Sequence, residues 1–567
     1  MARIIRGTGT ALAVLAGVAT MASGAALADT GTAPVAAPNS GAFLAGLHAR
    51  ETHDYSAAAE FLGVVLQGDT VDLDLLQDSF GAMASAGRFE EAARIGLKLQ
   101  ELGARSDIIT LVLLLEDYKA GRLDQAIKAA EGLSNDGLAQ FVGPLARAWL
   151  EVDAARHDDA IKALAPLGEI DGVKGLHGLH LGLINELAKR PADAEKIYQA
   201  TAADPTQLSF RLAEVFGNFH ERRGEWDKAK LVYEKFAENF PDNAMVGLVL
   251  DRLEARKKPK PAITSPRDGL AEAMLNIGSV LSQNSGSDVA LMLIRASLDL
   301  RSDSAAAQVM LADQLAAMGH YDEAIEVYRG VDRSSPFSWQ ARLQIAEYLD
   351  KMEQVDEAIA QLDDMIAERK EVADAAMLKG DILRGHERFA EAAGAYDTAI
   401  ERVSALKENH WPLLYYRGIA LERSKQWPRA EADFLKALEL MPDQPNVLNY
   451  LAYSWVELGQ NYDRSLEMLN KAVELRPRDG YIVDSLGWVY FRIGQFDKAV
   501  TELERAIELV PQDSVVNDHL GDAYWRVGRR NEARFQWQRA LNLEPAADQI
   551  APIQSKISNG LPNSSGT

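Results

Sequence analysis

Residues 514–545 read SVVNDHLGDAYWRVGRRNEARFQWQRALNLEP, and this stretch decides the fold. Two small residues, Gly521 and Ala533, are twelve positions apart, and Pro545 follows after another twelve. Small residues at facing places on two helices let the backbones approach closely, because larger side chains would hold them apart. Proline cannot continue a helix, so Pro545 marks the end of the second one. The stretch therefore predicts a hairpin of two packed helices.

The small residue of the second helix recurs along the whole chain at a spacing that is almost always 34. The recurring residues are Ala58, Ala92, Ala126, Ala160, Ala194, Ala229, Ala290, Ala324, Ala358, Ala392, Ala430, Ser465, Ala499 and Ala533. A fixed period of this length means that each unit is one supersecondary element stacked on the next. We therefore expect a solenoid in which each repeat contacts its neighbours.

The turn between the two helices has its own signature. Residues 87–92 read GRFEEA, and 121–126, 319–324 and 494–499 also begin with Gly and end with the recurring Ala. Glycine takes the left-handed conformation that ends a helix. The Asp or Glu that follows lies in the first turn of the next helix, where the helix dipole favours negative charge.

These positions resemble the tetratricopeptide repeat, which has a small residue at position 8, an aromatic near 11, Ala at 20, a large apolar residue near 24 and Pro at 32. The stretch 514–545 carries Gly521, Tyr524, Ala533, Trp537 and Pro545 in that register. The resemblance extends over some five hundred residues. It implies an all-α fold, an α-solenoid of about fourteen helix pairs in two arrays.

One interval of 61 residues, between Ala229 and Ala290, interrupts the period. It contains the sequence KKPKPAITSP at 257–266, which favours an extended connection after one unpaired helix. We therefore divide the chain into an N-terminal array (40–256), a linker (257–266) and a C-terminal array (267–545). Residues 546–561 fit a capping helix, which a solenoid needs over its last apolar face. Residues 562–567 are expected to be a disordered tail.

The first residues are typical of an export signal. Arg3 and Arg6 precede an apolar stretch that ends in Ala26-Leu27-Ala28, a small-residue cleavage site. We predict a signal peptide (1–28) followed by a linker (29–39), and a protein of the bacterial periplasm, free or held at the envelope through partners. The alternative is a retained membrane anchor, for which the stretch is a poor span. Cysteine is absent, so the chain has no disulfide, no thiol catalysis and no lipid-acceptor residue.

Composition and motifs argue against several activities. The formal net charge of −23 disfavours nucleic acid and anionic membranes as partners. The sequence has no phosphate-binding loop, zinc helix or nucleophile elbow. His177 and His180 have a metal-compatible spacing without a third ligand, so we expect helix-surface histidines, no metal and no cofactor. Ser404 to Lys407 matches Ser-x-x-Lys without companion motifs. We predict a protein that is not an enzyme; an unrecognised catalytic site is the alternative.

In the tetratricopeptide family the first helix of each pair lines the concave face, with positions 2, 5, 9, 12 and 13 exposed there. In the C-terminal array this resemblance implies a partner-binding surface of Asn446, Asn449, Tyr453, Tyr481, Asp484, Trp488, Phe491, Arg492, Asp518, Asp522, Trp525 and Arg526. Aromatic residues beside Arg and Asp are suited to gripping an extended peptide or a partner loop. The alternative is that the aromatic residues pack between repeats. In the N-terminal array, Leu176, Leu179 and Leu183 take the equivalent places.

The last repeats, residues 449–453, 479–488 and 517–525, resemble those of a proteobacterial envelope tetratricopeptide family. That family includes adaptor lipoproteins of periplasmic carboxyl-terminal-processing proteases, which bring cell-wall hydrolases to the protease. The resemblance implies a scaffold whose partners are other envelope proteins, including such a protease and its substrates. The chain lacks the family's lipid-modified cysteine. The alternative is a scaffold of another envelope machine, for polysaccharide synthesis and export or outer-membrane assembly.

Overall fold

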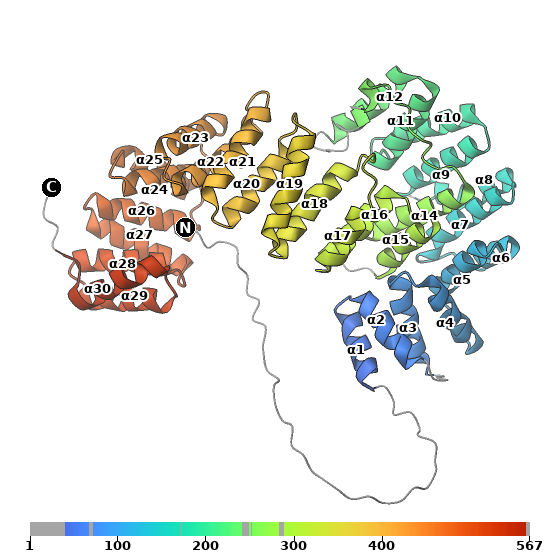
Figure 1. The fold of residues 1–567 in the computed structure, drawn as a ribbon, viewed down its shortest axis with the longest axis horizontal. Helices are drawn as coiled ribbons and strands as arrows, with labels where there is room; N and C mark the ends of the chain where they lie inside the picture. Colours follow the sequence, from blue (N-terminus) through green and yellow to red (C-terminus); the bar gives the residue numbers. More distant parts are fainter. Residues whose placement is uncertain are drawn as a thin grey trace, which may run out of the picture.

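The computed structural model describes residues 40–66, 72–170, 172–240, 249–250, 252–282 and 288–562, and every regular element among them is a helix. The helices form antiparallel pairs that stack into a long curved body (Figure 1). The predicted all-α solenoid is confirmed. The predicted signal peptide and linker (1–39) and residues 563–567 lie outside the described residues.

Among the residues that the structure describes, the first array contains six complete helix pairs. Their bounds are α1 (Ser40–Glu51), α2 (Tyr55–Val65), α3 (Leu73–Ser85), α4 (Phe89–Glu101), α5 (Asp107–Lys119), α6 (Leu123–Glu131), α7 (Ala139–Asp153), α8 (His157–Gly168), α9 (Lys174–Leu187), α10 (Pro191–Ala202), α11 (Phe210–Arg223) and α12 (Trp226–Asn239). After the connection come α14 (Pro266–Leu281) and α15 (Asp288–Leu300).

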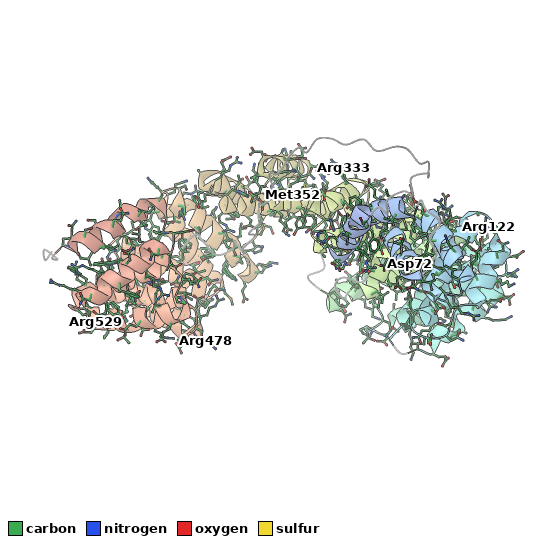
Figure 2. All side chains as sticks on the ribbon, turned by 90° about the horizontal axis from the view of Figure 1, so that it is seen from below. Asp72, Arg122, Arg333, Met352, Arg478 and Arg529 are labelled. Atoms are coloured by element: carbon green, nitrogen blue, oxygen red, sulfur yellow. The ribbon has the colours of Figure 1, made fainter. Side chains whose placement is uncertain are left out.

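The remaining helices continue the stack to the C-terminus. They are α16 (Ala305–Ala317), α17 (Tyr321–Arg329), α18 (Ser338–Lys351), α19 (Val355–Glu368), α20 (Asp374–Gly385), α21 (Phe389–Arg402), the 3-10 turn η1 (Glu408–His410), α22 (Trp411–Arg423), α23 (Trp427–Leu440), α24 (Pro445–Glu457), α25 (Tyr462–Leu475), α26 (Gly480–Arg492), α27 (Phe496–Leu509), α28 (Ser514–Arg526), α29 (Arg530–Asn542) and α30 (Ala547–Asn559). Figure 2 shows the body thinner near Met352 than at either end.

The recurring small residues lie at the contacts within the pairs. All fourteen, from Ala58 to Ala533, have 0% of their surface exposed. The small residue of the first helix faces a large side chain four positions beyond the marker, and in several repeats this side chain is aromatic. A Cβ on Gly182 would lie 2.1 Å from the ring of Tyr198, and one on Gly521 would lie 2.5 Å from Trp537. The predicted close approach is confirmed, and the large side chain on the second helix sets its limit.

The turn signature is also confirmed. Gly87, Gly121, Gly319 and Gly494 have φ between 76° and 89°, the left-handed region in which glycine has no steric penalty. Where the sequence has no glycine at this place, another residue takes the same conformation, as Lys425 does at φ 65°. The turn geometry is therefore a property of the repeat and not of glycine alone.

The pair α14–α15 departs from simple stacking. Helix α14 packs on α7 and α9, and α15 packs on α3, although more than 110 residues separate α14 from α7 in sequence. One hydrophobic core contains Leu76, Leu179, Leu183 and Met274 and extends to Leu300. The expectation that each repeat contacts only its neighbours is therefore wrong here. The linker 257–266 divides the sequence, but it does not divide the core.

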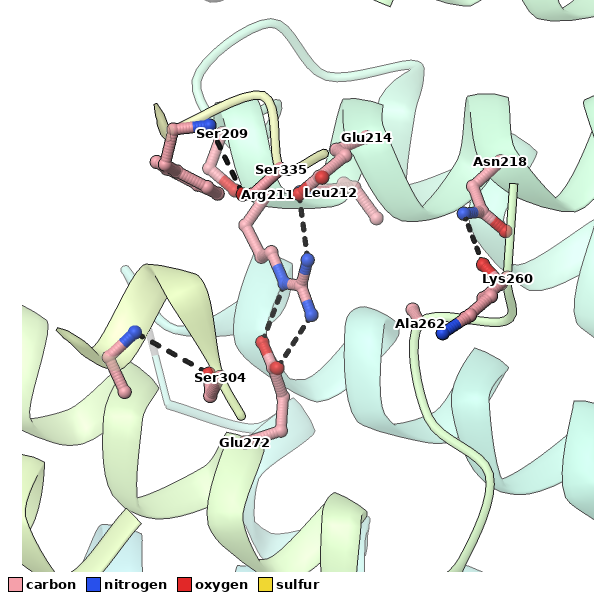
Figure 3. A network of polar contacts seen from close by, with 12 residues as sticks. Ser209, Arg211, Leu212, Glu214, Asn218, Lys260, Ala262, Glu272, Ser304 and Ser335 are labelled. Carbon is pink, nitrogen blue, oxygen red and sulfur yellow. Dashed lines mark hydrogen bonds and ion pairs between the residues drawn. The ribbon is translucent and has the colours of Figure 1, made fainter. Parts of the chain in front are cut away.

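A buried ion pair holds α14 against the first array (Figure 3). The guanidinium of Arg211 on α11 donates to both carboxylate oxygens of Glu272 at 2.8 and 2.7 Å, and to Glu214 at 2.7 Å. The side chain of Glu272 is 4% exposed. The extended connection is tied down beside it, because the Asn218 amide donates to the carbonyl of Lys260 at 2.8 Å.

A glycine marks the closest approach of α14 to α7, and it provides a stability test. A Cβ on Gly269 would lie 2.3 Å from the indole of Trp149. Gly269→Ala is therefore expected to lower the free energy of unfolding by about 1–3 kcal/mol through overpacking. Urea unfolding measures this change.

The matched control is Gly394→Ala, in the middle of α21, where a Cβ would have nothing within 4 Å. This change should stabilise the protein by up to about 1 kcal/mol, because alanine favours a helix more than glycine does. Equal effects of the two substitutions would contradict the close packing of α14 on α7.

None of the helices in the described part of the chain combines the length and the apolar character needed to cross a bilayer.

Candidate functional site

The first helices of the last three pairs, α24, α26 and α28, lie side by side. They carry a polar and aromatic group that we call the first-helix cluster. It consists of Tyr453, Glu457, Asp484, Trp488, Phe491, Arg492 and His519. Helix periodicity brings these residues to one surface, because positions four apart share a helix face.

Glu457 is the polar centre of the first-helix cluster. Its carboxylate accepts a hydrogen bond from the indole nitrogen of Trp488 at 2.6 Å and one from Arg492 at 2.8 Å. The side chain of Glu457 is 44% exposed and that of Arg492 is 28% exposed. The charged groups are therefore held in place while part of each still faces solvent, an arrangement that can bind polar groups of a partner.

The indole of Trp488 is stacked between two other rings. The His519 ring lies 4.0 Å away at an angle of 13°, and the Phe491 ring lies 4.9 Å away at 10°. His519 in turn contacts the buried carboxylate of Asp484 at 3.0 Å. Trp488 is half-buried, so both readings of the aromatic residues apply to it: it packs between repeats and it contributes to the surface.

The other predicted residues of α24 and α26 differ in exposure. Asn449 is buried, whereas Asn446, Tyr453 and Tyr481 are half-buried. Asn446 accepts a hydrogen bond from Arg476 at 3.0 Å. Burial, and then the nearby carboxylates of Glu457 and Asp484, raise the pKa of Tyr453 well above its usual value. Its hydroxyl therefore stays protonated and can donate a hydrogen bond.

The predicted residues of the last repeat are covered by the chain itself. The ammonium of Lys556 on α30 lies 2.7 Å from Asp518 and 2.8 Å from Asp522. The backbone at Gly560 packs against the indole of Trp525, and Arg526 donates a hydrogen bond to the carbonyl of Pro562 at 2.9 Å. The structure therefore brings all twelve predicted residues to neighbouring helices, and those on α28 contact the C-terminal segment.

Three groups of this region have shifted pKa values. Burial, together with the Asp518 carboxylate, raises the pKa of Asp522 to about 6, although Lys556 and Trp537 favour its ionised form. Burial would lower the pKa of His519, but the carboxylate of Asp484 outweighs it, and the pKa is raised above its usual value. Burial would also lower the pKa of Lys556, but Asp522 and Asp518 raise it.

These shifts predict that the last repeat loses stability as pH rises. An unfolded Asp522 ionises near pH 3.8, whereas the folded one keeps its proton to about pH 6. The free energy of unfolding therefore falls as the pH rises from about 3.8 to about 6. His519 extends the fall above pH 6.5, because the folded state holds its proton more tightly than the unfolded state does. Hydrogen exchange of α28, corrected for intrinsic rates, should show more protection at pH 5 than at pH 7.5.

The control for the pH dependence is Asp522→Asn, which keeps an oxygen that can accept from the Trp537 indole. In this variant the fall between pH 4 and 6 should disappear, and the part due to His519 should remain. An unchanged profile would assign the dependence to other groups.

Two residues of this region were missed as binding candidates. His519 falls one position after Asp518, on the part of the helix that packs against the preceding repeat. Lys556 belongs to a segment that the repeat pattern explains as a cap. The pairing of Lys556 with two acids depends on the face that α30 presents, which periodicity alone does not give.

Other features of the described part of the chain lie outside the first-helix cluster. An open hollow of 630 Å³ lies at Arg476–Tyr481 and Val510, and a more enclosed, mainly apolar one of 390 Å³ lies between α3, α5 and α15. Glu195, His220 and Glu225 bring ligand atoms within 4.8 Å of one another. Lys228 lies 2.7 Å from Glu195 and already balances part of this charge.

The expectation of helix-surface histidines is wrong for His180. This residue is fully buried, and its Nδ1 accepts a hydrogen bond from the indole of Trp149 at 3.0 Å. Burial lowers the pKa of His180 to about 4, so the ring is neutral at pH 7. His177 is half-buried. The reason for the error is α14, which covers this face of α9.

The repeat geometry agrees with comparisons to known families. Models described as Tetratricopeptide repeat match residues 209–243, 275–338, 315–382, 411–444 and 451–514. These segments are tetratricopeptide repeats. Arrays of tetratricopeptide repeats act as protein–protein interaction scaffolds.

Individual relatives cover parts of the chain. A TPR repeat-containing protein of Pseudomonas aeruginosa is 27% identical over 173 residues, which are 30% of this chain and 28% of the relative. The match thus spans less than a third of the relative's length. A tetratricopeptide repeat protein from Parabacteroides merdae is 16% identical with a TM-score of 0.38, covering 45% of this chain and 99% of that one. YrrB, described as a TPR protein with an unusual peptide-binding site, is 22% identical with a TM-score of 0.27, covering 34% of this chain and 97% of its own.

Proposed function

We propose that this chain is a non-catalytic scaffold of the bacterial periplasm that binds segments of partner proteins on the first-helix cluster. The observation that carries the proposal is the arrangement around Glu457. Its carboxylate fixes Trp488 and Arg492 while all three side chains keep some exposed surface. Aromatic and arginine side chains in such settings dominate the energy of many protein interfaces.

The shape of the repeats suits an elongated partner. Successive first helices present their residues at regular intervals, so an extended segment or a helix can contact several repeats at once. The protonated hydroxyl of Tyr453 offers a donor, and Glu457 offers an acceptor for a cationic side chain. The proposed partner segment therefore combines an apolar side chain, for Trp488 and Phe491, with a polar or basic one.

The finer proposal is an adaptor that presents substrates, such as cell-wall hydrolases, to a carboxyl-terminal-processing protease. It is supported by the resemblance of residues 449–453, 479–488 and 517–525 to the terminal repeats of that envelope family. Export to the periplasm is supported by the signal-like residues 1–28. On this proposal the purified chain accelerates proteolysis of the hydrolase and has no hydrolytic activity of its own.

The test begins with affinity capture from an envelope extract, followed by mass spectrometry and a binding titration with the captured partner. Arg492→Ala is expected to weaken binding about 30-fold, a loss of about 2 kcal/mol, because it removes a cation held at the surface. Thermal melting should remain close to that of the wild type. For the adaptor, the readout is the rate of hydrolase cleavage by the protease with and without the chain.

The matched control is Arg329→Ala. Arg329 pairs with Glu357 of the next repeat at 3.0 Å, and both side chains are about half exposed. This variant should bind the partner as the wild type does. Wild-type affinity of Arg492→Ala would place the interface elsewhere, and unchanged cleavage in the presence of the chain would remove the adaptor role.

A further inference from the structure

The C-terminal segment lies on the surface of the last repeat in the manner of a bound ligand. Helix α30 packs on α29, and its Lys556 reaches across to Asp518 and Asp522 on α28. One repeat earlier, His519 of α28 contacts Asp484 of α26 in a similar way. The segment therefore takes the place that the first helix of another repeat would occupy.

Beyond Lys556, the backbone crosses the indole of Trp525. A Cβ on Gly560 would lie 1.9 Å from a carbon of that ring, and Gly560 has φ 73°. Both facts require glycine at this position. Arg526 then donates to the carbonyl of Pro562 at 2.9 Å, so the chain after the helix is also held.

The attachment of the segment is shallow. Among residues 547–562, all of which the structure describes, Ile553 and Gly560 are the buried ones. Most of the others are exposed, including Ile550 at 38%. By contrast, α28 has eight buried residues, from Val516 to Tyr524. The acceptor surface is thus part of a well-packed repeat, whereas its occupant is attached through Ile553, with Ile557 and Leu561 packed beside it, and through the ion pairs of Lys556.

We propose that the surface formed by Asp518, Asp522, Trp525 and Arg526 is a binding site for a helical protein segment with a lysine four residues before a glycine. The chain's own residues 553–562 occupy it as a displaceable ligand. The two carboxylates select the lysine, and the indole admits glycine at the end of the helix. A partner with this pattern gains the site by displacing the segment.

This inference rests on the proposed scaffold function for its biological role, but its test does not. The probe is a fluorescently labelled peptide of residues 546–562, titrated into full-length chains. In Gly560→Val the added side chain meets Trp525, so the tethered segment is released and the surface becomes available. This variant is expected to bind the peptide at least tenfold more tightly than the wild-type chain, whose own segment competes. Hydrogen exchange of α30 reports the release.

Three controls make the result specific. Ser558→Val is the matched chain variant, because Ser558 is exposed on the same helix; it should bind the peptide as weakly as the wild type. Peptides carrying Lys556→Gln or Gly560→Val should bind the released chain at least tenfold more weakly than the natural peptide. The double variant Lys556→Glu/Gly560→Val is titrated as well, so that release does not depend on one substitution.

The outcomes separate clearly. Equal binding of the peptide to wild-type and released chains would overturn the proposal, and so would a released α30 without peptide binding. Peptide binding that ignores Lys556 and Gly560 would also overturn it. Partner capture by the first-helix cluster is measured separately, so either proposal can fail while the other stands.

Discussion

Arg211→Met is expected to lower the free energy of unfolding by about 3–5 kcal/mol, because it leaves the carboxylate of Glu272 buried without its cation. Burial would raise the pKa of Glu272, but Arg211 outweighs it and holds the pKa at about 2. An unfolded Glu272 ionises near pH 4.5. The stability that this pair contributes is therefore present above pH 4.5 and is lost as pH falls toward 2. Urea unfolding at pH 7 and at pH 3 measures the cost and its decrease in acid.

Two controls distinguish a buried pair from charge effects in general. Arg211→Met/Glu272→Leu should recover most of the loss, because replacing both partners with apolar side chains is often nearly neutral. Arg329→Met, at the exposed pair with Glu357, should cost at most about 1 kcal/mol. A cost for Arg211→Met as small as that for Arg329→Met would show that α14 does not depend on this pair.

The second large effect is expected from Trp149→Ala, which should lower the free energy of unfolding by about 3–5 kcal/mol. Trp149 is 1% exposed and lies where α7 meets α14, and its indole donates to His180. The substitution opens a cavity and leaves the His180 nitrogen without its donor. Because α14 packs on α7, hydrogen exchange should increase in α14 and α15 as well as in α7 to α9.

Trp455→Ala is the matched comparison. Trp455 is also 1% exposed, but it lies in the regular part of the stack, where contacts join neighbours. Trp455→Ala should lower the free energy of unfolding by a similar amount. The increase in hydrogen exchange should be confined to α23 through α26. If Trp149→Ala also affected only its sequence neighbours, the cross-sequence packing of α14 would be contradicted.

Much of the fold could be predicted from the sequence, because the repeat is specified by local features. The small residues such as Ala499, the turn glycines such as Gly494 and the large side chains four positions beyond the markers act within one hairpin. The placement of α14–α15 could not be predicted in this way. Arg211 and Glu272 look like ordinary helix charges in the sequence. They lie 61 positions apart on different helices, so their pairing depends on how α11 and α14 are placed.

The candidate site was predicted in part for the same reason. The family positions place Trp488, Arg492 and Trp525 on one surface, since helix periodicity fixes the face. Helix periodicity does not show which other segment of the chain covers that face. The C-terminal segment covers Trp525 through Gly560 and Lys556, and α14 covers Leu179 and Leu183. Helix α14 comes from a segment distant in sequence, whereas α30 is the next helix after the last pair, and the face that it presents is what periodicity leaves open.

The position of α14 has a consequence for how the chain is made. Synthesis delivers the N-terminal helices first, and Gly269 follows Trp149 by 120 residues. Whether the chain emerges from the ribosome or from an export channel, its N-terminal end leads, as N-terminal parts generally fold first. The face of the first array that α14 covers therefore stays open to other chains until α14 has followed. The time-limited risk of aggregation therefore falls on the first half of the protein, whereas each later repeat meets its neighbour as soon as it emerges.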